Sequence, residues 1–401
     1  MNKTKITIIG GSNSAHTLIP LLSNRGHIIN LLTQNPDKWS NQIEMQYTLP
    51  DNSIKSVVEG NISLISSDPS KVIPESTIII LSLPVSKYRE VLHRIAPYIS
   101  NDSNVYIGTI YGQGGFNWMV EEIKTKFNLN KINYFAVGLI PWITRTLEYG
   151  KIGLNYGAKA VNVVALSDKN KFDYLQNLIL DDLCFNYFGK GKFVLSDNFL
   201  SLTLSVDNQI IHLSRLYSMF LKNGGEWKEK EQVPLFYKDY DDLSAEMLKM
   251  LDDDYTLLRS AVIEKFDSHS FKYMLNYLDL EQLSYNSSNE NIKISFVNSE
   301  TLGQIPTPVI LDKNSNWVFD KSHRFFTDDL FYGLVIAKWI ATELNIKVKT
   351  IDEIINWAQR VVGDTILVGD ELLTDNEHSK SPYKYGTPSE YGFSSISDIR
   401  G

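Results

Sequence analysis

A single cysteine, Cys184, is present among the 401 residues. One thiol can form neither an intrachain disulfide nor a cysteine-based metal site, and such low cysteine usage is typical of a protein in a reducing compartment. We interpret Cys184 as a small apolar side chain of the core.

Long apolar runs and an excess of basic residues are also missing. The N-terminal residues Met1–Lys5 lead to a five-residue apolar stretch that ends at Gly10, too short for the core of a secretory signal. No later run approaches the ~18 to 20 apolar residues that a membrane-spanning helix needs. The formal net charge of −8 provides no basic face for nucleic acid or an anionic membrane. We therefore expect a cytoplasmic protein, monomer or homodimer, that binds small molecules.

The first half of the chain alternates between short β-rich runs and segments with helical spacing. The strand candidates are Lys5–Ile9, Ile28–Leu32, Thr77–Leu83, Asn104–Ile107 and Tyr134–Val137. The helical segments are Ala15–Asn24 and Val85–Ile99. This alternation predicts a parallel sheet covered by helices.

The second half shows apolar residues at three- and four-residue intervals, the spacing of amphipathic helices. The segments are Asn208–Leu221, Leu243–Phe266, Phe331–Leu344 and Ile351–Val362. A chain of this length favours two domains, and Gly189-Lys190-Gly191 precedes the expected division into residues 1–195 and 196–401. Residues 287–320, with Pro306 and Pro308, are expected to be loop-rich, and the tail after Asp375 is expected to be irregular.

A glycine turn follows the first predicted strand directly. Its sequence, Gly10-Gly11-Ser12-Asn13-Ser14-Ala15, matches G-x-G-x-x-A except that Ser12 replaces the middle glycine. The N–H groups and the positive dipole end of the following helix suit a pyrophosphate, and the Ser12 hydroxyl is itself a phosphate donor. The turn predicts a Rossmann-type NAD(P) domain; the alternative is a glycine turn in an unrelated α/β fold.

The residues after the second predicted strand bear on the choice of cofactor. Thr33-Gln34-Asn35 contains no acidic residue to bind both ribose hydroxyls of NAD, and these neutral groups are compatible with a 2′-phosphate, although no arginine is present to clamp it. We favour NADPH, with NADH as the alternative. We also assign Leu83 and Pro84 to the cofactor site.

Five motifs together carry a resemblance to a known family. They are Gly10-Gly11-Ser12-Asn13-Ser14-Ala15-His16, Gly112-Gln113-Gly114-Gly115-Phe116, Pro141-Trp142-Ile143-Thr144-Arg145, Asn208-Gln209-Ile210-Ile211-His212, and Arg324-Phe325-Phe326-Thr327-Asp328-Asp329 with Tyr332-Gly333-Leu334. Over most of its length the chain resembles the octopine/nopaline (opine) dehydrogenase family. The last two motifs are the most specific.

The resemblance implies a fold and a reaction. The fold is an α/β Rossmann-type N-terminal domain plus a mostly α-helical C-terminal domain like that of 6-phosphogluconate dehydrogenase. In the reaction, an amino acid and a 2-oxo acid form an imine, which hydride from the nicotinamide reduces to a secondary amine. In such enzymes a His–Asp pair of the helical domain faces the nicotinamide across the interdomain cleft; motif matching assigns it to His212 and Asp329, and Arg324 to the carboxylate of the oxo acid.

The chemistry of these side chains supports the same assignment. Imidazole has an unperturbed pKa near working pH, so it suits the proton transfers of condensation, and a carboxylate beside it orients the ring. The planar fork of Arg324 matches a carboxylate bidentately. The structural alternatives are a core histidine at His212, and a helix cap and a surface charge at Asp329 and Arg324.

Other polar residues near these motifs have weaker assignments. Gln113 and Thr144 each follow a predicted strand end, and Asn208 lies one helical turn before His212, so each is a candidate substrate contact as well as an ordinary turn or helix residue. Thr327 is expected to cap the helix after Arg324. His323 is the rival base.

No metal site is expected. The remaining histidines, His16, His27, His93, His269 and His378, show no i, i+4 pairing typical of zinc motifs. The acidic runs Asp239–Asp242 and Asp252–Asp254 lack a glycine-spaced loop and are interpreted as solvated helix faces.

Two other functions stay open. One is simple reduction of a 2-oxo acid to a hydroxy acid, and the other is an NAD(P)-binding sensor without catalysis. Dependence of the rate on an amine separates the first alternative from opine formation, and cofactor binding without turnover identifies the second.

Overall fold

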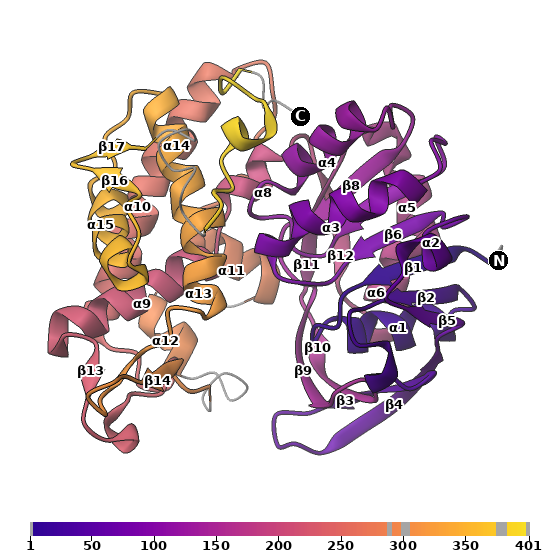
Figure 1. The fold of residues 1–401 in the computed structure, drawn as a ribbon, viewed down its shortest axis with the longest axis horizontal. Coiled ribbons are helices and arrows are strands. Elements are labelled where there is room, and N and C mark those ends of the chain that lie inside the picture. Colours follow the sequence, from indigo (N-terminus) through magenta and orange to yellow (C-terminus); the bar gives the residue numbers. More distant parts are fainter. Residues whose placement is uncertain (1–2, 287–290, 298–304, 374–382, 398–401) are drawn as a thin grey trace. The chain divides into compact units, whose positions relative to one another are not determined.

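The computed structural model describes residues 3–286, 291–297, 305–373 and 383–397. The contacts divide the chain into two compact units (Figure 1). The first comprises residues up to Gly112 together with Phe116–Leu202, and the second comprises Gln113–Gly115 and the chain from Thr203 onward. The boundary between the two units therefore lies between Leu202 and Thr203, seven residues after the expected boundary.

An eight-stranded sheet forms the centre of the first unit. Its strand order is β12-β11-β8-β7-β6-β1-β2-β5. The bounds are β1 (Lys5–Ile9), β2 (Ile28–Leu32), β5 (Leu64–Ser66), β6 (Ile78–Leu81), β7 (Tyr106–Thr109), β8 (Asn133–Val137), β11 (Val161–Leu166) and β12 (Lys192–Ser196). From β5 to β8 the strands are parallel, in the 3-2-1-4-5-6 order of the Rossmann fold, whereas β11 pairs antiparallel to β8. The predicted α/β class is confirmed.

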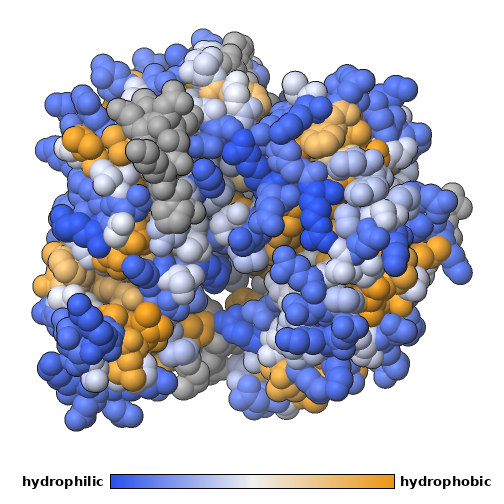
Figure 2. Space-filling view, viewed as in Figure 1, coloured by the Kyte–Doolittle hydropathy of each residue, from blue (hydrophilic) through white to orange (hydrophobic). Residues whose placement is uncertain are grey.

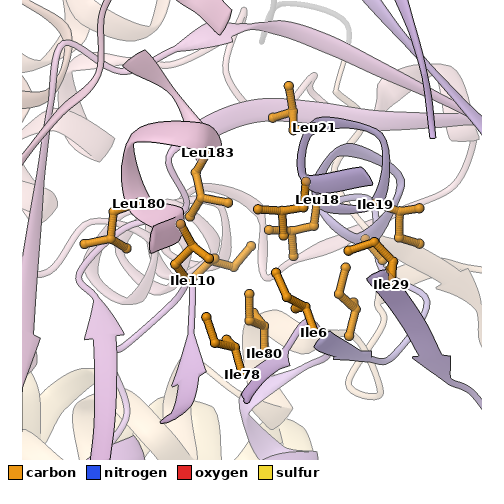
Figure 3. Close-up of a cluster of buried hydrophobic side chains, with 14 of the residues drawn as sticks. Ile6, Leu18, Ile19, Leu21, Ile29, Ile78, Ile80, Ile110, Leu180 and Leu183 are labelled. Atoms are coloured by element: carbon orange, nitrogen blue, oxygen red, sulfur yellow. The ribbon is translucent and has the colours of Figure 1, made fainter. Parts of the chain in front are cut away.

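Both faces of this sheet are buried, which explains the nearly continuous apolar runs of its strands. Ile6 and Ile80 point to one face, where they meet Leu18 of α1 (Ala15–Asn24) and Leu183 of α6 (Asp181–Leu183) (Figure 3). Ile79, of the opposite parity, is equally inaccessible to solvent.

Further helices flank the sheet. They are α2 (Pro69–Val72), α3 (Tyr88–Ile95), α4 (Phe116–Lys126), α5 (Phe172–Leu175), the π-helix η5 (Gln176–Leu180) and α7 (Phe185–Phe188), with 3-10 turns η1 (Pro36–Lys38), η2 (Val85–Lys87), η3 (Ala96–Tyr98) and η4 (Lys169–Lys171). The helix predicted over residues 85–99 is therefore η2, α3 and η3 in succession. Pro97, the second residue of η3, has no N–H group and so interrupts the α-helical hydrogen bonding there.

A second, four-stranded sheet was not predicted. It has the order β4-β3-β10-β9, with β3 (Gln42–Thr48), β4 (Ile54–Asn61), β9 (Trp142–Glu148) and β10 (Ile152–Ala158). The sheet packs closely on α1, because a Cβ at Gly60 would lie 2.5 Å from Cα of Pro20 and one at Gly153 would lie 2.7 Å from Cβ of His16. The pairs β3–β4 and β9–β10 are each adjacent in the sequence, but β3 and β10, which join the two pairs, are about 100 residues apart, so no local pattern indicates the whole sheet.

The second unit is mainly helical, as predicted. Its helices are α8 (Leu200–Leu204, which begins in the first unit), α9 (Asn208–Asn223), α10 (Asp242–Lys265), α11 (Tyr277–Tyr285), α12 (Ile292–Val297), α13 (Arg324–Thr327), the π-helix η7 (Leu330–Leu334), α14 (Val335–Glu343) and α15 (Lys349–Val362). Short turns η6 (Lys230–Gln232) and η8 (Pro388–Tyr391) complete the helical elements of its described part. Two small sheets contain β13 (Glu226–Trp227), β14 (Val309–Leu311) and β15 (Trp317–Phe319), and β16 (Leu367–Val368) and β17 (Glu371–Leu372).

The two segments expected to be irregular are only partly described. Residues 287–290 and 298–304 lie outside the described ranges, as do His378 and the rest of 374–382. The described part of residues 287–320 contains three short elements, α12, β14 and β15, with irregular backbone between them.

The acidic runs are not simply solvated faces. Asp241 caps α10 by accepting from the Ser244 N–H, and buried Asp254 accepts from the N–H groups of Thr350 and Ile351 at the start of α15. Both carboxylates accept hydrogen bonds from free N–H groups at helix N-termini, so the interpretation of these runs as solvated helix faces was wrong for Asp241 and Asp254.

Hydrophilic residues predominate on the surface shown in Figure 2, where the hydrophobic ones form separate patches. Within the described ranges, no helix is both long enough and apolar enough to cross a bilayer.

Candidate active site

The glycine turn joins β1 to α1 in the first unit. Gly10 has φ of 105°, and a Cβ on it would lie 2.4 Å from the Ser82 carbonyl oxygen at the end of β6. A Cβ on Gly11 would lie 2.3 Å from the Tyr149 hydroxyl. The turn therefore requires glycine at Gly10 both for its left-handed backbone and for the close approach of β6.

The polar residues of the turn hold it to neighbouring segments. The Ser12 hydroxyl lies 2.7 Å from that of Ser82, and the Asn13 side chain accepts a hydrogen bond of 2.8 Å from Thr146. Ser14 is the N-cap of α1 but makes no side-chain capping bond, and the first turn of α1 contains no acidic residue. No side chain of this turn therefore neutralises the positive N-terminal end of the α1 dipole, which can bind an anion. These residues fit the pyrophosphate of a dinucleotide.

His16, to which the sequence assigned no role, braces this turn. Its Nδ1 lies 3.0 Å from the Ser12 carbonyl oxygen, and its Nε2 accepts from the Gly150 N–H at 2.8 Å. Burial lowers the pKa of His16, which favours the neutral ring with the hydrogen on Nδ1. Two aromatic rings flank it, with centroids 4.6 Å away for Trp39 and 5.6 Å away for Tyr149.

The other predicted cofactor residues lie at strand ends on either side of β1. Thr33, after β2, is buried and its hydroxyl accepts from the Asn35 N–H at 3.4 Å, whereas Gln34 is exposed. Leu83 lies directly beside Gly10, and Pro84 is exposed. This is the point where the strand order reverses, the usual ligand site of such sheets.

In the second unit, His212 of α9 is bonded to Asp329. Its Nδ1 lies 2.7 Å from the Asp329 Oδ2, and the two residues are 1% and 3% exposed. Its Nε2 lies 3.2 Å from the Tyr237 hydroxyl. The ring stacks on Phe325 with centroids 3.7 Å apart and meets the Phe236 ring at 5.5 Å.

Local backbone features bring these residues together. The His323 ring accepts from the Phe325 N–H and so begins α13, which means that the expectation of Thr327 as the N-cap was wrong. The π-helix η7 begins directly after Asp329; such irregular turns occur often at functional sites. Within it, a Cβ on Gly333 would lie 2.8 Å from the Gln209 side chain, so glycine permits η7 to approach α9.

Burial perturbs both members of the His–Asp pair. It raises the pKa of Asp329 to about 7, although the positive charge of Arg324 acts in the opposite direction. Burial and the same guanidinium group lower the pKa of His212 well below its usual value. In its neutral form, His212 donates from Nδ1 to the Asp329 carboxylate and accepts at Nε2 from Tyr237.

Arg324 is exposed, with its guanidinium carbon 5.7 Å from the Phe325 ring centroid. Its side chain makes no hydrogen bond or ion pair with the rest of the described chain, so its donors are available to an anion. Its neighbour His323, the rival base, is committed to the cap of α13, and burial beside Arg324 lowers the pKa of His323 to about 4.

The remaining predicted substrate contacts lie in different elements. The Gln113 amide donates to the Ser205 carbonyl at 2.7 Å within the second unit. Thr144 is buried in β9 of the first unit, opposite Asn155 of β10. Asn208 is the first residue of α9 and is partly exposed.

Two residues near His212 were missed by the sequence analysis. Tyr237 lies in the loop before α10, and Arg215 of α9 holds that loop with hydrogen bonds to the carbonyls of Phe236 and Asp239 and to the Ser244 hydroxyl. Arg215 is only 1% exposed, although it lies three residues after His212 on the same helix. A buried arginine in an apolar helical pattern was the available signal, because such a charge needs partners. In the described part of the chain, no three His, Cys, Asp or Glu residues gather as a metal site.

The chain is similar in sequence to known proteins. A family model described as "NAD/NADP octopine/nopaline dehydrogenase, alpha-helical domain" matches residues 195–362. An opine dehydrogenase from Haliotis discus hannai is 24% identical over 96% of this chain and 96% of its own.

Solved structures share the fold. Octopine dehydrogenase with NADH and L-arginine matches with a TM-score of 0.81 at 20% identity, covering 99% of this chain and 98% of that chain. Yersinopine dehydrogenase with NADP+ bound matches with a TM-score of 0.65 at 13% identity, covering 89% and 90%. The fold and the glycine turn are those of an NAD(P)-dependent dehydrogenase. Residues 195–362 match the helical-domain model of the octopine/nopaline (opine) dehydrogenase family, and the chain is similar to opine dehydrogenases over nearly its whole length, which confirms the resemblance seen in the sequence.

The raised pKa of Asp329 predicts a pH-dependent cost in stability. Its folded pKa of about 7 exceeds the ordinary value of 3.8, so its contribution is fully present below pH 3.8 and is lost as the pH rises through about 7. Asp329→Asn does not ionise. The free energy of unfolding of the wild type, measured with urea, should therefore fall relative to this variant between about pH 4 and pH 8, by up to about 4 kcal/mol at 1.36 kcal/mol per pKa unit.

The control is Asp253→Asn, which changes an exposed carboxylate of the same unit. It should show no such divergence from the wild type. A difference between wild type and Asp329→Asn that stays constant with pH would contradict the assigned direction.

Proposed function

We propose that the protein is an opine dehydrogenase that uses NAD(P)H to condense an amino acid, or another amine, reductively with a 2-oxo acid such as pyruvate or 2-oxoglutarate. The product is an N-(carboxyalkyl) amino acid. The observation that carries the proposal is the buried His212–Asp329 pair next to the exposed, unpaired Arg324, in a chain similar to opine dehydrogenases.

His212 acts as the general acid and base in this proposal. Its Nδ1 is bonded to Asp329, so proton exchange takes place at Nε2. The ring accepts a proton from the attacking amine and returns one when the carbinolamine loses water. Asp329 fixes the ring orientation and stabilises the imidazolium form while it exists.

Arg324 binds the carboxylate of the 2-oxo acid. Two parallel N–H donors of a guanidinium match the two oxygens of a carboxylate, which fixes the orientation of the neighbouring carbonyl carbon. Its segment also carries Asp329 five residues later, so both groups belong to one continuous backbone segment formed by α13 and η7.

The first unit binds the cofactor through residues 10–15 and the strand-end residues Thr33, Gln34, Leu83 and Pro84. When bound, the nicotinamide supplies the hydride that reduces the imine carbon. We retain NADPH as the preferred cofactor, because the β2 end is neutral and contains no carboxylate to repel a 2′-phosphate. The relative solved with NADH and L-arginine supports an amino acid as the amine. Gln113, Thr144 and Asn208 are secondary candidates for substrate contact.

The first prediction from the proposed function concerns the dependence of turnover on an amine. Oxidation of NADPH and NADH, followed by absorbance, should require both a 2-oxo acid and an amine when 2-oxo acids are paired with a panel of amino acids. Mass spectrometry should find the secondary amine product. Equal oxidation by the 2-oxo acid alone would establish a simple reductase instead, and tight cofactor binding without turnover on any pair would indicate a sensor.

The second prediction concerns His212→Asn, which retains a side-chain N–H for Asp329 but has no titratable Nε2. Its kcat should fall by about 10²- to 10⁴-fold, the usual contribution of general acid–base catalysis. The matched control is His269→Asn, because His269 of the same unit contacts the rings of Phe266 and Phe271. Wild-type kcat in His212→Asn would contradict the proposed role.

The third prediction concerns Arg324→Ala. The KM for the 2-oxo acid should rise by about 10- to 100-fold, because hydrogen bonds to a charged group contribute about 1.5–3 kcal/mol. The KM for the amine should change much less. Lys321→Ala, which removes an exposed positive charge three residues away, is the control. A similar rise in both variants would show that general electrostatic attraction, and not a specific clamp, is involved.

A further inference from the structure

Both nitrogens of the His212 ring already have partners within the second unit. Nδ1 faces Asp329 at 2.7 Å and Nε2 faces the Tyr237 hydroxyl at 3.2 Å. Phe325 covers one face of the ring, Phe236 meets it edge-on, and the residue is only 1% exposed. A proton that leaves or reaches Nε2 in this arrangement therefore meets the Tyr237 oxygen first.

Tyr237 is held firmly where it makes this contact. Its ring lies 4.9 Å from the Phe236 ring and 5.5 Å from the Phe296 ring, and it is 7% exposed. Arg215 fixes the backbone on both sides of it through the carbonyls of Phe236 and Asp239. The hydroxyl is thus a preoriented group that both donates and accepts hydrogen bonds.

We propose that Tyr237 is a proton relay between His212 and the reacting substrate, an inference that rests on the proposed function. As the carbinolamine collapses, its C–O bond breaks while the nitrogen lone pair forms the C=N bond. The Tyr237 O–H bond breaks to give its proton to the departing oxygen, which leaves as water. At the same time the phenol oxygen takes the Nε2 proton of the His212 imidazolium, so the phenol is regenerated and the imidazole becomes neutral. The reverse reaction moves both protons the other way.

The groups that influence this proton come from four segments. Asp329 precedes η7, Arg324 and His323 belong to the start of α13, Asp207 precedes α9, and Tyr237 lies in the loop before α10. Arg324 opposes and Asp207 favours the charged form of His212. A phenol bonded to Nε2 transfers protons without adding another net charge to this buried environment.

The test compares Tyr237→Phe with Tyr240→Phe. Both variants keep an aromatic ring and lose one hydroxyl, and Tyr240 is a matched control because it lies in the same loop, is 2% exposed and packs on Phe296 at 4.5 Å, while its hydroxyl donates to the Ser244 carbonyl. Tyr237→Phe should lower kcat at least about tenfold with little change in either KM. Tyr240→Phe should stay within about twofold of the wild type.

A second measurement gives the number of protons that move during the transfer. The solvent isotope effect on kcat, measured in mixtures of light and heavy water, should vary quadratically with deuterium content in the wild type and linearly in Tyr237→Phe. A merely structural effect of the hydroxyl leaves this dependence unchanged.

Three results would overturn the relay. An unchanged or raised kcat in Tyr237→Phe would mean that substrate displaces the hydroxyl from Nε2, an equal loss in Tyr240→Phe would mean that packing is responsible, and a linear isotope dependence in the wild type would mean a single moving proton. The opine assignment fails separately, if turnover proves independent of amine. In that case the same two variants, assayed on reduction of the 2-oxo acid, still decide the role of Tyr237.

Discussion

The arrangement of the second unit depends on one buried hydrogen bond, between Nδ1 of His212 and the carboxyl group of Asp329. Removing both groups from water disfavours their charged forms, so the burial of each in a helical core costs free energy. The elements around them are shaped accordingly: α13 supplies an aromatic cover, η7 departs from α-helical geometry, and Arg215 secures the loop that contacts the other ring nitrogen. These features are understandable as the support that a titratable pair requires when it is kept away from solvent.

In the first unit a neutral histidine has a different task. His16 joins the carbonyl of the glycine turn to the backbone N–H of Gly150, and thereby links the main sheet to the smaller one. Its lowered pKa keeps Nε2 as an acceptor. Both histidines are buried, so burial alone does not distinguish the structural ring of His16 from the ring of His212, which we propose to transfer protons. The partner does: backbone groups at His16, and a carboxyl and a phenol at His212.

The sequence predicted the parts of the structure that local patterns encode. Strands β1 and β2 and helix α1 occur over the predicted residues, and the alternation of elements correctly indicated the α/β class. Motif matching also selected His212 and Asp329, which the fold brings to hydrogen-bonding distance across 117 positions of sequence. The pairing of β3 with β10 and the contact of Tyr237 with His212 depend on long-range packing, so no short pattern revealed them. Thr327 was misjudged because a histidine ring, not a hydroxyl, satisfies the first free N–H of α13.

Gly333 illustrates how the backbone geometry beside Asp329 constrains residues outside the candidate site. It contributes no side chain to the candidate site, and its Cα only makes room for Gln209. A π-turn contains more residues per turn than an α-turn, so η7 shifts the angular register of everything that follows it. The orientation of α14, whose residues Val335–Ala341 are all buried, is therefore set by a local widening of the helix beside Asp329. A one-residue deletion in η7 would rotate α14 by about 100°, the angle per residue of an α-helix, and would remove the buried residues Val335–Ala341 from their present contacts without altering either side chain of the His212–Asp329 pair.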